Sequence, residues 1–505
     1  MMKRALLLLS LLAVPCVVTS CKDDAAPGNS ITTESPLDKM CNLLKLSGRS
    51  EKEIKIFRAG YEGDTVTLEN QKDGIHIDIY CMGAAAAGNK ELVLQCLDKG
   101  AAPNEGLYGA ALGGQKALVL QMLGKGATLN WGLKGAALGG HMDIVQFMLD
   151  NGAHPNEGLY GAALGGHMDI VQFMLDKSAT NYDWGLIGAA AGGHLDIVQL
   201  MLSKGAHPKA GLYGAAAGGH IDIVQLMLYK GATDFNWGLE GAAAGGHMDI
   251  MQLMLEKGAD LNWGLYGAAA GGHMDIVQLM LDKGATDYDR GLRGAAYGGH
   301  MDIIQLMLKK GADPDEGLLG AALGGHMDIV QLLLSKGADA YNDGLLGAAW
   351  GGHMDIVQLM LSKGASPNKG LYGAAAGGHM DIVQFMLKKG ANPDEGLIGA
   401  AYGGHMNIVQ LMLSKGVDPD YGLIGAASGG HMDIVQLLLS KGADAYNDGL
   451  LGAASGGHMD IVQLMLSKGA TDLDSALKIA EDFGHTECAE FIRAAMKNGA
   501  ALKQL

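Results

Sequence analysis

The feature that most constrains this chain is a Gly-Gly-His triplet that recurs at nearly constant spacing along most of its length. Successive triplets lie 26 or 27 residues apart, with histidines at positions 141, 167, 194, 220, 247, 273, 300, 326, 353, 379, 405, 431 and 458. Imperfect copies carry Asn89 and Gln115 before this run and His485 after it, which makes sixteen units. Such a period is typical of a chain built by stacking many copies of one structural unit.

One unit, residues 157–181, shows what each copy is expected to fold into. Its first half places Leu159, Ala162 and Ala163 on one face of a short helix. Residues 168–175 predict a second helix that is apolar in every direction except for one narrow polar stripe. Such a helix needs cover on three sides, which a single helix pair cannot supply but stacked copies can. The sequence therefore predicts an all-α fold, an α-solenoid of about sixteen helix-turn-helix units.

Composition and net charge argue against one class of chain and one class of partner. The chain has 80 glycines and only 10 prolines, but its apolar fraction of 48% separates it from Gly-rich disordered sequences. The formal net charge is −17, and binding to phosphate groups requires a basic face. We therefore expect no nucleic acid among the partners.

The first twenty residues predict a lipoprotein signal peptide. Lys3 and Arg4 precede an apolar stretch, residues 5–18, that is too short to span a bilayer. The stretch ends in Val18-Thr19-Ser20-Cys21, which resembles the lipobox of bacterial lipoproteins. The resemblance implies cleavage before Cys21 and acylation of its amino group and sulfur, which would anchor the chain durably. An ordinary secretory signal followed by an incidental cysteine is the alternative.

The residues after this cysteine suggest a location. Lys22-Asp23-Asp24 resembles the signal that sends some Gram-negative lipoproteins to the outer face of the outer membrane. We therefore expect a bacterial outer-membrane lipoprotein at the cell surface, or otherwise on the periplasmic side, that contacts the membrane only through its lipid. The polar composition of residues 21–36 predicts a flexible tether.

The repeated unit resembles the ankyrin repeat. The positions that match the ankyrin pattern in register are Leu159, Ala162, Ala163, Gly166, His167, Ile170, Val171, Met174, Leu175 and Ala179. The resemblance implies that the repeated histidine braces the loop backbone. Each unit is about six residues shorter than the usual 33, and the deficit lies where ankyrin proteins project a β-hairpin finger. We expect short loops in place of these fingers, and the usual Thr-Pro-Leu-His box is absent.

The remaining segments predict caps at the two ends of the array. The expected organisation is a signal peptide at 1–20, a tether at 21–36, an N-terminal capping region at 37–80, the repeat array at 81–470 and a C-terminal capping repeat at 471–505. Within the first cap, residues 37–46 and 51–58 predict helices. Alternating apolar residues between Asp64 and Tyr80 predict a β-hairpin.

No residue pattern indicates catalysis, a metal or a cofactor, so we expect a protein that is not an enzyme. Histidines of adjacent units should lie about 9–10 Å apart, whereas metal ligands lie ~2 Å from the ion. Cys41, Cys81, Cys96 and Cys488 do not recur with the array, and whether they form disulfides stays open.

Positions that vary between units are the candidate contacts with a partner. One series on the first helix comprises Tyr108, Lys134, Tyr160, Ile187, Tyr213, Glu240, Tyr266, Arg293, Leu319, Leu346, Tyr372 and Ile398. A second series four residues later comprises Leu112, Leu138, Leu164, Ala191, Tyr297, Leu323, Trp350, Tyr402 and Ser428. The ankyrin resemblance implies that the second series lies on a concave partner-binding surface, whereas half of the first series could be structural. Aromatic residues before the first helices, Trp131, Trp184, Trp237 and Trp263, are either interface anchors or packing between units.

Of these positions, the proposed partner-binding residues are Tyr108, Leu112, Trp131, Leu138, Tyr160, Leu164, Trp184, Trp237, Trp263, Arg293, Tyr297, Leu323, Trp350, Tyr372 and Tyr402. The sequence thus favours a protein that binds another protein or a peptide along its concave face, such as a protein of a host or a neighbouring cell. A passive spacer or a periplasmic scaffold without a high-affinity ligand is the alternative.

Overall fold

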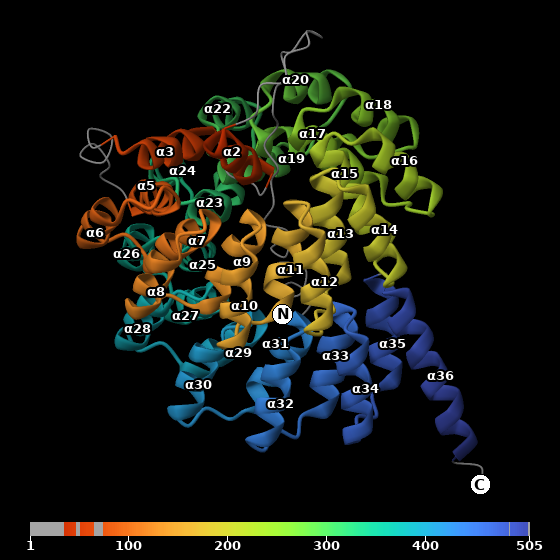
Figure 1. Ribbon diagram of the computed structural model, residues 1–505. Helices are drawn as coiled ribbons and strands as arrows, with labels where there is room; N and C mark the ends of the chain where they lie inside the picture. The colour runs from red at the N-terminus through yellow and green to blue at the C-terminus, as the bar shows by residue number, and fades with distance from the viewer. Residues whose placement is uncertain (1–34, 47–50, 65–73, 484, 503–505) are drawn as a thin grey trace. The chain divides into compact units, whose positions relative to one another are not determined.

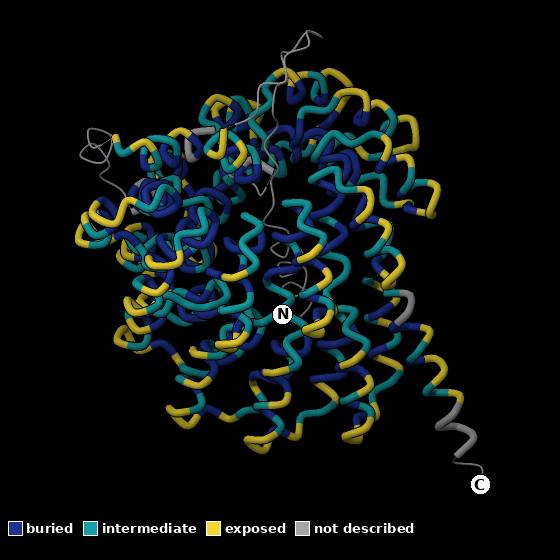
Figure 2. The backbone as a smooth tube through the Cα atoms, in the orientation of Figure 1, coloured by how far each residue is buried: buried dark blue, intermediate teal, exposed yellow. Residues whose placement is uncertain are grey.

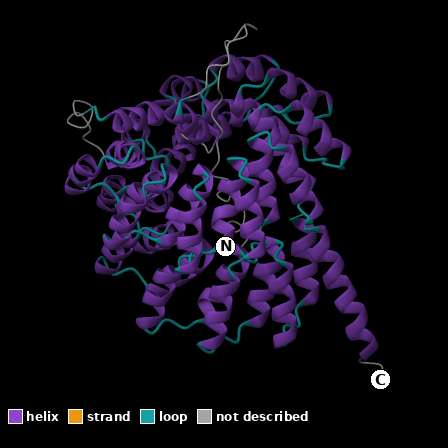
Figure 3. Ribbon diagram, viewed as in Figure 1, coloured by secondary structure: helices purple, strands orange, loops and turns teal. Residues whose placement is uncertain are grey.

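The computed structural model describes residues 35–46, 51–64, 74–483 and 485–502. Within these ranges the chain forms 34 helices and no strand (Figure 1, Figure 3). The fold is a repeated helical solenoid, as the sequence predicts. The chain divides into two compact units, Met1–Gly317 and Leu318–Leu505.

Helices α5 to α36 form sixteen consecutive pairs. The first helices of the pairs are α5 (Gly74–Ala86), α7 (Pro103–Leu112), α9 (Leu129–Gly139), α11 (Pro155–Leu164), α13 (Tyr182–Ala191), α15 (Pro208–Gly218), α17 (Phe235–Gly245), α19 (Leu261–Gly271), α21 (Tyr288–Gly298), α23 (Pro314–Leu323), α25 (Tyr341–Gly351), α27 (Pro367–Gly377), α29 (Pro393–Gly403), α31 (Asp420–Gly429), α33 (Tyr446–Gly456) and α35 (Leu473–Asp482). The second helices are α6 (Lys90–Asp98), α8 (Lys116–Gly124), α10 (Met142–Asp150), α12 (Met168–Asp176), α14 (Leu195–Ser203), α16 (Ile221–Tyr229), α18 (Met248–Glu256), α20 (Met274–Asp282), α22 (Met301–Lys309), α24 (Met327–Ser335), α26 (Met354–Ser362), α28 (Met380–Lys388), α30 (Met406–Ser414), α32 (Met432–Ser440), α34 (Met459–Lys468) and α36 (Thr486–Leu502).

Glycine and alanine let consecutive first helices pack against each other almost backbone to backbone. On α21, Gly291, Gly294 and Gly298 follow one another at helical spacing and share one face. A Cβ atom at Gly294 would lie 2.5 Å from the carbonyl oxygen of Tyr266 on α19. This close approach is the reason that the chain needs so many glycines, because any side chain at these positions would push neighbouring units apart.

The Gly-Gly-His triplet holds each unit to the one before it. After α21, Gly299 ends the helix with φ +79°, in the left-handed region that favours glycine. His300 then directs its Nε2 atom to the carbonyl oxygen of Ala270 in the preceding unit, at 3.1 Å. Its ring occupies space beside Gly272 of that unit, where a Cβ atom would lie 2.4 Å from the His300 Cε1 atom. The three residues recur together because the backbone conformation, the close approach and the hydrogen bond require one another.

The second helices pack against the first helices of their own pairs, as α12 does against α11, and present their polar stripe to solvent. On α12, Ile170, Val171 and Met174 are buried, whereas the stripe formed by Asp169, Gln172 and Asp176 is exposed. The predicted amphipathic pattern is therefore confirmed. Figure 2 shows the same distribution along the array, with exposed residues gathered on the loops and second helices.

The N-terminal cap differs in part from its prediction. Helices α2 (Pro36–Leu46) and α3 (Glu51–Glu62) confirm the two expected helices. The predicted hairpin is wrong where the structure describes it, because Gly74–Ala86 is helix α5, and residues 65–73 lie outside the described residues. The alternation of isoleucines was misleading because every residue from 77 to 82 except Asp78 is buried, in a helix that packs against both α3 and α7.

Helix α3 takes the stacking position of a first helix. A Cβ atom at Gly83 of α5 would lie 2.0 Å from the carbonyl oxygen of Phe57, and one at Gly60 of α3 would lie 2.1 Å from that of Tyr80. These are the same close contacts that join first helices inside the array. The cap thus continues the stack with a helix that lacks the repeat sequence.

Candidate functional site

We call the two variable series of the first helices together the first-helix face. Its first series packs against the residues that begin the next first helix. The ring of Tyr108 meets that of Trp131 edge to face with centroids 6.2 Å apart, and Tyr160 meets Trp184 in the same way at 5.8 Å. Edge-to-face pairs of this kind stabilise a contact beyond the area they bury. The predicted position of the tryptophans before the first helices is wrong, because Trp131, Trp184, Trp237 and Trp263 lie in the first turn of α9, α13, α17 and α19. From there Trp131 and Trp184 join adjacent units.

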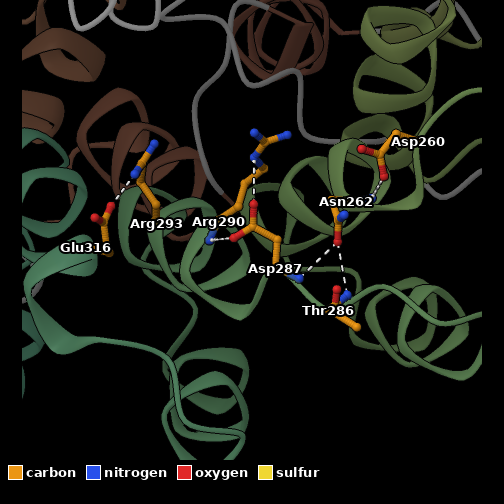
Figure 4. A network of polar contacts seen from close by, with 7 residues as sticks. All are labelled: Asp260, Asn262, Thr286, Asp287, Arg290, Arg293 and Glu316. Carbon is orange, nitrogen blue, oxygen red and sulfur yellow. Dashed lines mark hydrogen bonds and ion pairs between the residues drawn. The ribbon is translucent and has the colours of Figure 1, made fainter. Parts of the chain in front are cut away.

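Tyr213 and Trp237 make the third aromatic pair of this type, with centroids 6.2 Å apart. At other junctions the same two positions form an ion pair. Lys134 Nζ lies 2.8 Å from Glu157 Oε2, and Arg293 is paired with Glu316 (Figure 4). At these five junctions the residue of the first series therefore matches the residue 23 or 24 positions later, either as two aromatic rings or as two opposite charges.

Cations of the chain also cover two of the tryptophans. Lys134 Nζ lies 5.6 Å from the ring centroid of Trp131, and the guanidinium of Arg290 lies 4.7 Å from that of Trp263. Arg290 is held in place by Asp287, whose Oδ2 atom lies 3.4 Å from its Nε atom (Figure 4). These are cation–π contacts, and both Trp131 and Trp263 are half-buried.

The second series is buried at one end of the array and accessible further along. Leu112, Leu138 and Leu164 are at most 2% exposed, so the structure gives these leucines a packing role and their partner-binding role stays a prediction. The half-buried members are Tyr297 in the first compact unit and Leu323, Trp350, Tyr402 and Ser428 in the second. Tyr297 packs against Ala244 and Ala270.

Trp350, Tyr372 and Tyr402 form an aromatic cluster on three consecutive first helices of the second unit. Trp350 and Tyr402 meet edge to face at 6.3 Å, although one whole repeat separates them. The repeat between them carries Ala376 at the same position, and its small side chain leaves room for both rings. Burial raises the pKa of Tyr372 and of Tyr402, and Tyr402 and Glu395 raise that of Tyr372 further. The cluster joins Trp350 and Tyr402 of the second series with Tyr372 of the first.

A ladder of amide and carboxylate side chains, which the sequence reasoning missed, replaces the β-hairpin fingers. The backbone N–H groups of Thr286 and Asp287 both donate to Asn262 Oδ1 at 3.0 Å (Figure 4). The same bond to a backbone N–H group 24 residues later is made by Asp78, Asn104, Asn130, Asn156, Asp183, Asn236, Asp289, Asn342, Asn368, Asp420 and Asn447. The recurrence of Asn or Asp at this position was visible in the sequence and could have identified the ladder.

The repeated histidines brace the array and do not gather into a metal site. A ring Nε2 atom lies 2.9 to 3.2 Å from a carbonyl oxygen of the preceding unit for His141, His167, His194, His220, His247, His273, His300, His353, His379, His405, His431, His458 and His485. The bracing role implied by the resemblance is confirmed. Among the described residues, no three His, Cys, Asp or Glu side chains are grouped so that they could hold a metal ion.

Four cysteines are buried and none of them is in a disulfide: Cys41, Cys81, Cys96 and Cys488. The thiols of Cys81 on α5 and Cys96 on α6 are hydrogen-bonded to each other. This bond, together with burial, raises the pKa of Cys81, and it lowers the pKa of Cys96. Cys81 and Cys96 are joined by this hydrogen bond and not by a disulfide.

The predicted lipid anchor lies outside the described residues. Residues 1–34, which include Cys21 and Lys22-Asp23-Asp24, are not described. In the part of the chain that is, no helix has both the length and the apolar character needed to cross a membrane.

Comparison with known families settles the fold family. The family described as ankyrin repeats (three copies) matches residues 133–211, 292–370, 345–422, 371–448 and 423–502, together more than half of the chain. This chain belongs to the ankyrin-repeat family. Ankyrin repeats indicate a role in protein–protein interaction, and folds of this kind are typically not enzymes. No curated protein sequence matches the chain.

Two solved structures of repeat proteins are similar to this ankyrin-repeat chain. The pentatricopeptide repeat protein PPR10 from maize has 14% sequence identity and a TM-score of 0.23, with 98% of this chain and 82% of that chain covered. PPR10 in complex with an 18-nt psaJ RNA element has 13% identity and a TM-score of 0.23, with 93% of this chain and 86% of that chain covered. At this TM-score the likeness carries no argument about the ligand of this chain.

The expectation that no nucleic acid binds this chain is contradicted and is withdrawn. One of the two solved structures reported above contains a bound RNA element, and the net charge alone was not sufficient ground for the exclusion. The reasoning failed because a net charge of −17 averages over the whole surface of an array, whereas a ligand contacts only part of it. No RNA ligand is assigned to this chain in its place.

Proposed function

We propose that this ankyrin-repeat chain is a membrane-anchored lipoprotein, without enzymatic activity, that binds a protein or peptide along its first-helix face. The observation that carries the proposal is the contrast between constant and variable positions. Glycine, histidine and the Asn or Asp ladder recur to hold the units together, whereas the first-helix face changes from unit to unit. A surface that changes while its scaffold stays constant is what recognition of one particular partner requires.

The accessible part of this face offers suitable anchors. Trp350 and Tyr402 are half-buried rings of the second unit that lie two repeats apart, and Tyr372 lies on the repeat between them. Tryptophan and tyrosine are enriched among residues that dominate binding energy. Leu323, on the same unit, adds a half-buried aliphatic side chain. We expect a partner to contact this group of side chains.

A photo-crosslinking experiment on living cells tests the proposal. A benzophenone amino acid replaces Tyr402 in one variant and Tyr229 in the other, because Tyr229 lies on second helix α16 and is 86% exposed. We expect the Tyr402 variant to yield one protein adduct of defined mass that the Tyr229 variant does not yield. Adducts from neither position, or the same adducts from both, would favour a passive spacer. A nucleic-acid adduct from Tyr402 would replace the protein-binding proposal with an RNA-binding one.

The anchor and the location form the second part of the proposal. The lipobox resemblance at Val18-Thr19-Ser20-Cys21 supports acylation of Cys21, and Lys22-Asp23-Asp24 supports the outer face of the outer membrane. Protease treatment of intact cells, with an antibody against residues 473–482 and a periplasmic control protein, tests the location. Loss of the signal while the control survives supports the cell surface. Protection until the outer membrane is opened would place the chain in the periplasm.

A Cys21→Ala variant tests the anchor itself. We expect this variant to lose incorporation of labelled palmitate and to leave the membrane fraction. Membrane retention without the label would contradict the lipoprotein proposal and favour an ordinary signal segment.

A further inference from the structure

The first helix pair of the array, α5 and α6, carries one cysteine on each helix. Cys81 stands at the position where every pair from α7–α8 to α33–α34 has leucine. Cys96 stands where the same pairs have methionine or leucine. Both cysteines are 0% exposed, and so are Leu107 and Met122 at the equivalent positions of the next pair. Two core positions of a single unit have therefore both changed to cysteine.

The two thiols are neighbours in the core that α5 and α6 share with the next unit. Helices α5 and α6 pack against each other (Figure 1), and the thiols of Cys81 and Cys96 are hydrogen-bonded. A Cβ atom at Gly106 on α7 would lie 3.5 Å from the Cys81 Sγ atom. At the equivalent junction one unit later, a Cβ atom at Gly132 would lie 3.3 Å from the Leu107 Cδ2 atom. Cys81 therefore takes the place of the repeated leucine.

Packing explains the size of these residues but not their sulfur atoms. Tyr80 is fully buried and stands where every pair from α7–α8 to α33–α34 has glycine. At one of these glycines, Gly106, a Cβ atom would lie only 2.9 Å from the Sδ atom of Met122. The ring of Tyr80 therefore needs a smaller residue than methionine at position 96. Alanine or valine would meet that need equally well, whereas two adjacent thiols can also form a covalent bond.

We propose that Cys81 and Cys96 form a disulfide, linking α5 to α6, when the chain folds in the presence of a disulfide oxidant. The inference rests on the proposed location outside the cytoplasm, because disulfides form and persist in oxidising compartments. The structure describes the two residues before this step, as adjacent thiols. The end units of a repeat array have a repeat on one side only, so they open more easily than internal units. A covalent link within the first pair counters this opening.

The link forms by exchange with the oxidant, which is oxidised glutathione or the disulfide of an oxidoreductase. The Cys96 thiolate attacks one sulfur of the oxidant, so that a mixed disulfide forms and one thiol leaves. The Cys81 thiolate then attacks the Cys96 Sγ atom, and the second thiol leaves. The two cysteines lose two protons and two electrons, and the oxidant takes up both pairs to become two thiols. The hydrogen bond from Cys81 lowers the pKa of Cys96, and Lys99 lowers it further against the effect of burial, so Cys96 is the first nucleophile.

Peptide mapping of the full chain tests the link directly. The chain is unfolded and then refolded in a mixture of reduced and oxidised glutathione, because both sulfurs are buried once folding is complete. The remaining thiols are blocked with N-ethylmaleimide before digestion with trypsin, which separates residues 73–90 from residues 91–99. We expect these two peptides to be joined by a bond that dithiothreitol breaks, and Cys41 and Cys488 to carry maleimide. Maleimide on both Cys81 and Cys96, or a link from either one to Cys41 or Cys488, would overturn the proposal.

Hydrogen exchange of the oxidised and reduced full chain measures what the link does. We expect reduction with dithiothreitol to speed amide exchange in α5 and α6 by about tenfold or more. Cys96→Ser should exchange at the reduced rate under both conditions. Its matched control is Cys488→Ser, which replaces another buried cysteine and should respond to dithiothreitol as the natural protein does. Exchange in α5 and α6 of the natural protein that is the same before and after reduction would overturn the stabilising role of the link.

Acid quenching of living cells, followed by maleimide blocking and the same digestion, separates this inference from the proposed location. The joined peptides in the quenched sample would support both. A link that forms in glutathione but is missing from quenched cells would contradict the location outside the cytoplasm and leave the pairing intact. Failure of the link to form in glutathione would overturn the pairing, whereas the proposed anchor would still be tested by Cys21→Ala.

Discussion

The substitution Gly294→Ala on α21 tests whether consecutive first helices are in backbone contact. A Cβ atom at this position would lie 2.5 Å from the carbonyl oxygen of Tyr266 and 3.2 Å from the backbone nitrogen of Ala270. Ordinary contacts between heavy atoms fall at about 3.5–4.0 Å, so α21 and α19 would have to separate by roughly 1 Å. Neither contact can be relieved by rotating a side chain, because both atoms belong to the backbone.

Two effects of opposite sign decide the outcome. Alanine favours a helix over glycine by about 1 kcal/mol, whereas forcing extra volume into a close-packed interface costs typically 1–3 kcal/mol. A separation of this size forfeits a quarter to a half of the dispersion attraction along the contact, which places the cost near the upper end. We expect Gly294→Ala to lower the free energy of unfolding by about 2 kcal/mol.

Gly124 provides the matched control, since it ends helix α8 and a Cβ atom there would have no neighbour within 4 Å. Gly124→Ala should raise stability by about 0.5–1 kcal/mol. The measurements are guanidinium unfolding followed by far-UV circular dichroism, and hydrogen exchange of the amides in α19 and α21. If Gly294→Ala proved as stable as Gly124→Ala, the first helices would not be in backbone contact and the account of the glycines would be refuted.

Two further predictions follow from the repeated contacts. Burial lowers the pKa of histidines 167, 220, 247 and 379, so below about pH 6.5 the unfolded chain binds more protons than the folded chain. The free energy of unfolding should therefore be greatest above about pH 6.5 and fall as the pH drops below it. An unfolding midpoint that is constant or higher at pH 5 than at pH 7.5 would contradict this. Asn262→Ala removes the acceptor of two backbone N–H groups and should lower the free energy of unfolding by about 1–2 kcal/mol. Its control is Lys209→Ala, at the same position of a unit without this acceptor, which should change the free energy of unfolding by less than about 0.5 kcal/mol. Equal effects of the two substitutions would show that the ladder is dispensable.

Periodicity was sufficient to predict the helix pairs and the second-helix faces. The polar stripe Asp169, Gln172 and Asp176 identified the exposed side because solvent contact is the main reason to keep polar residues on an otherwise apolar helix. The resemblance to ankyrin repeats also gave the correct role of the histidines, since His300 bonds to the backbone of Ala270. These features depend on local pattern and on contacts that recur identically in every unit.

Features that depend on neighbouring units were harder to predict. Isoleucines 77 and 79 alternate like a strand, but they lie in a run of the sequence that is buried almost throughout, where alternation carries no information. Leu112 and Tyr402 occupy equivalent positions, but Leu112 is 1% exposed and Tyr402 is half-buried. Which of the two is accessible depends on what surrounds each position in three dimensions. The pairing of Tyr160 with Trp184 across two units likewise becomes visible only once the register of stacking is known.

The measurement that tests the central claim most directly is the affinity of the crosslinked partner for three purified forms of the chain. Isothermal titration compares the natural protein with the double variant Trp350→Ala, Tyr402→Ala and with Tyr229→Ala, which removes an exposed ring from a second helix. We expect the double variant to lose about 2 kcal/mol or more of binding free energy and Tyr229→Ala to bind like the natural protein. Equal affinities for all three forms would contradict recognition through the first-helix face.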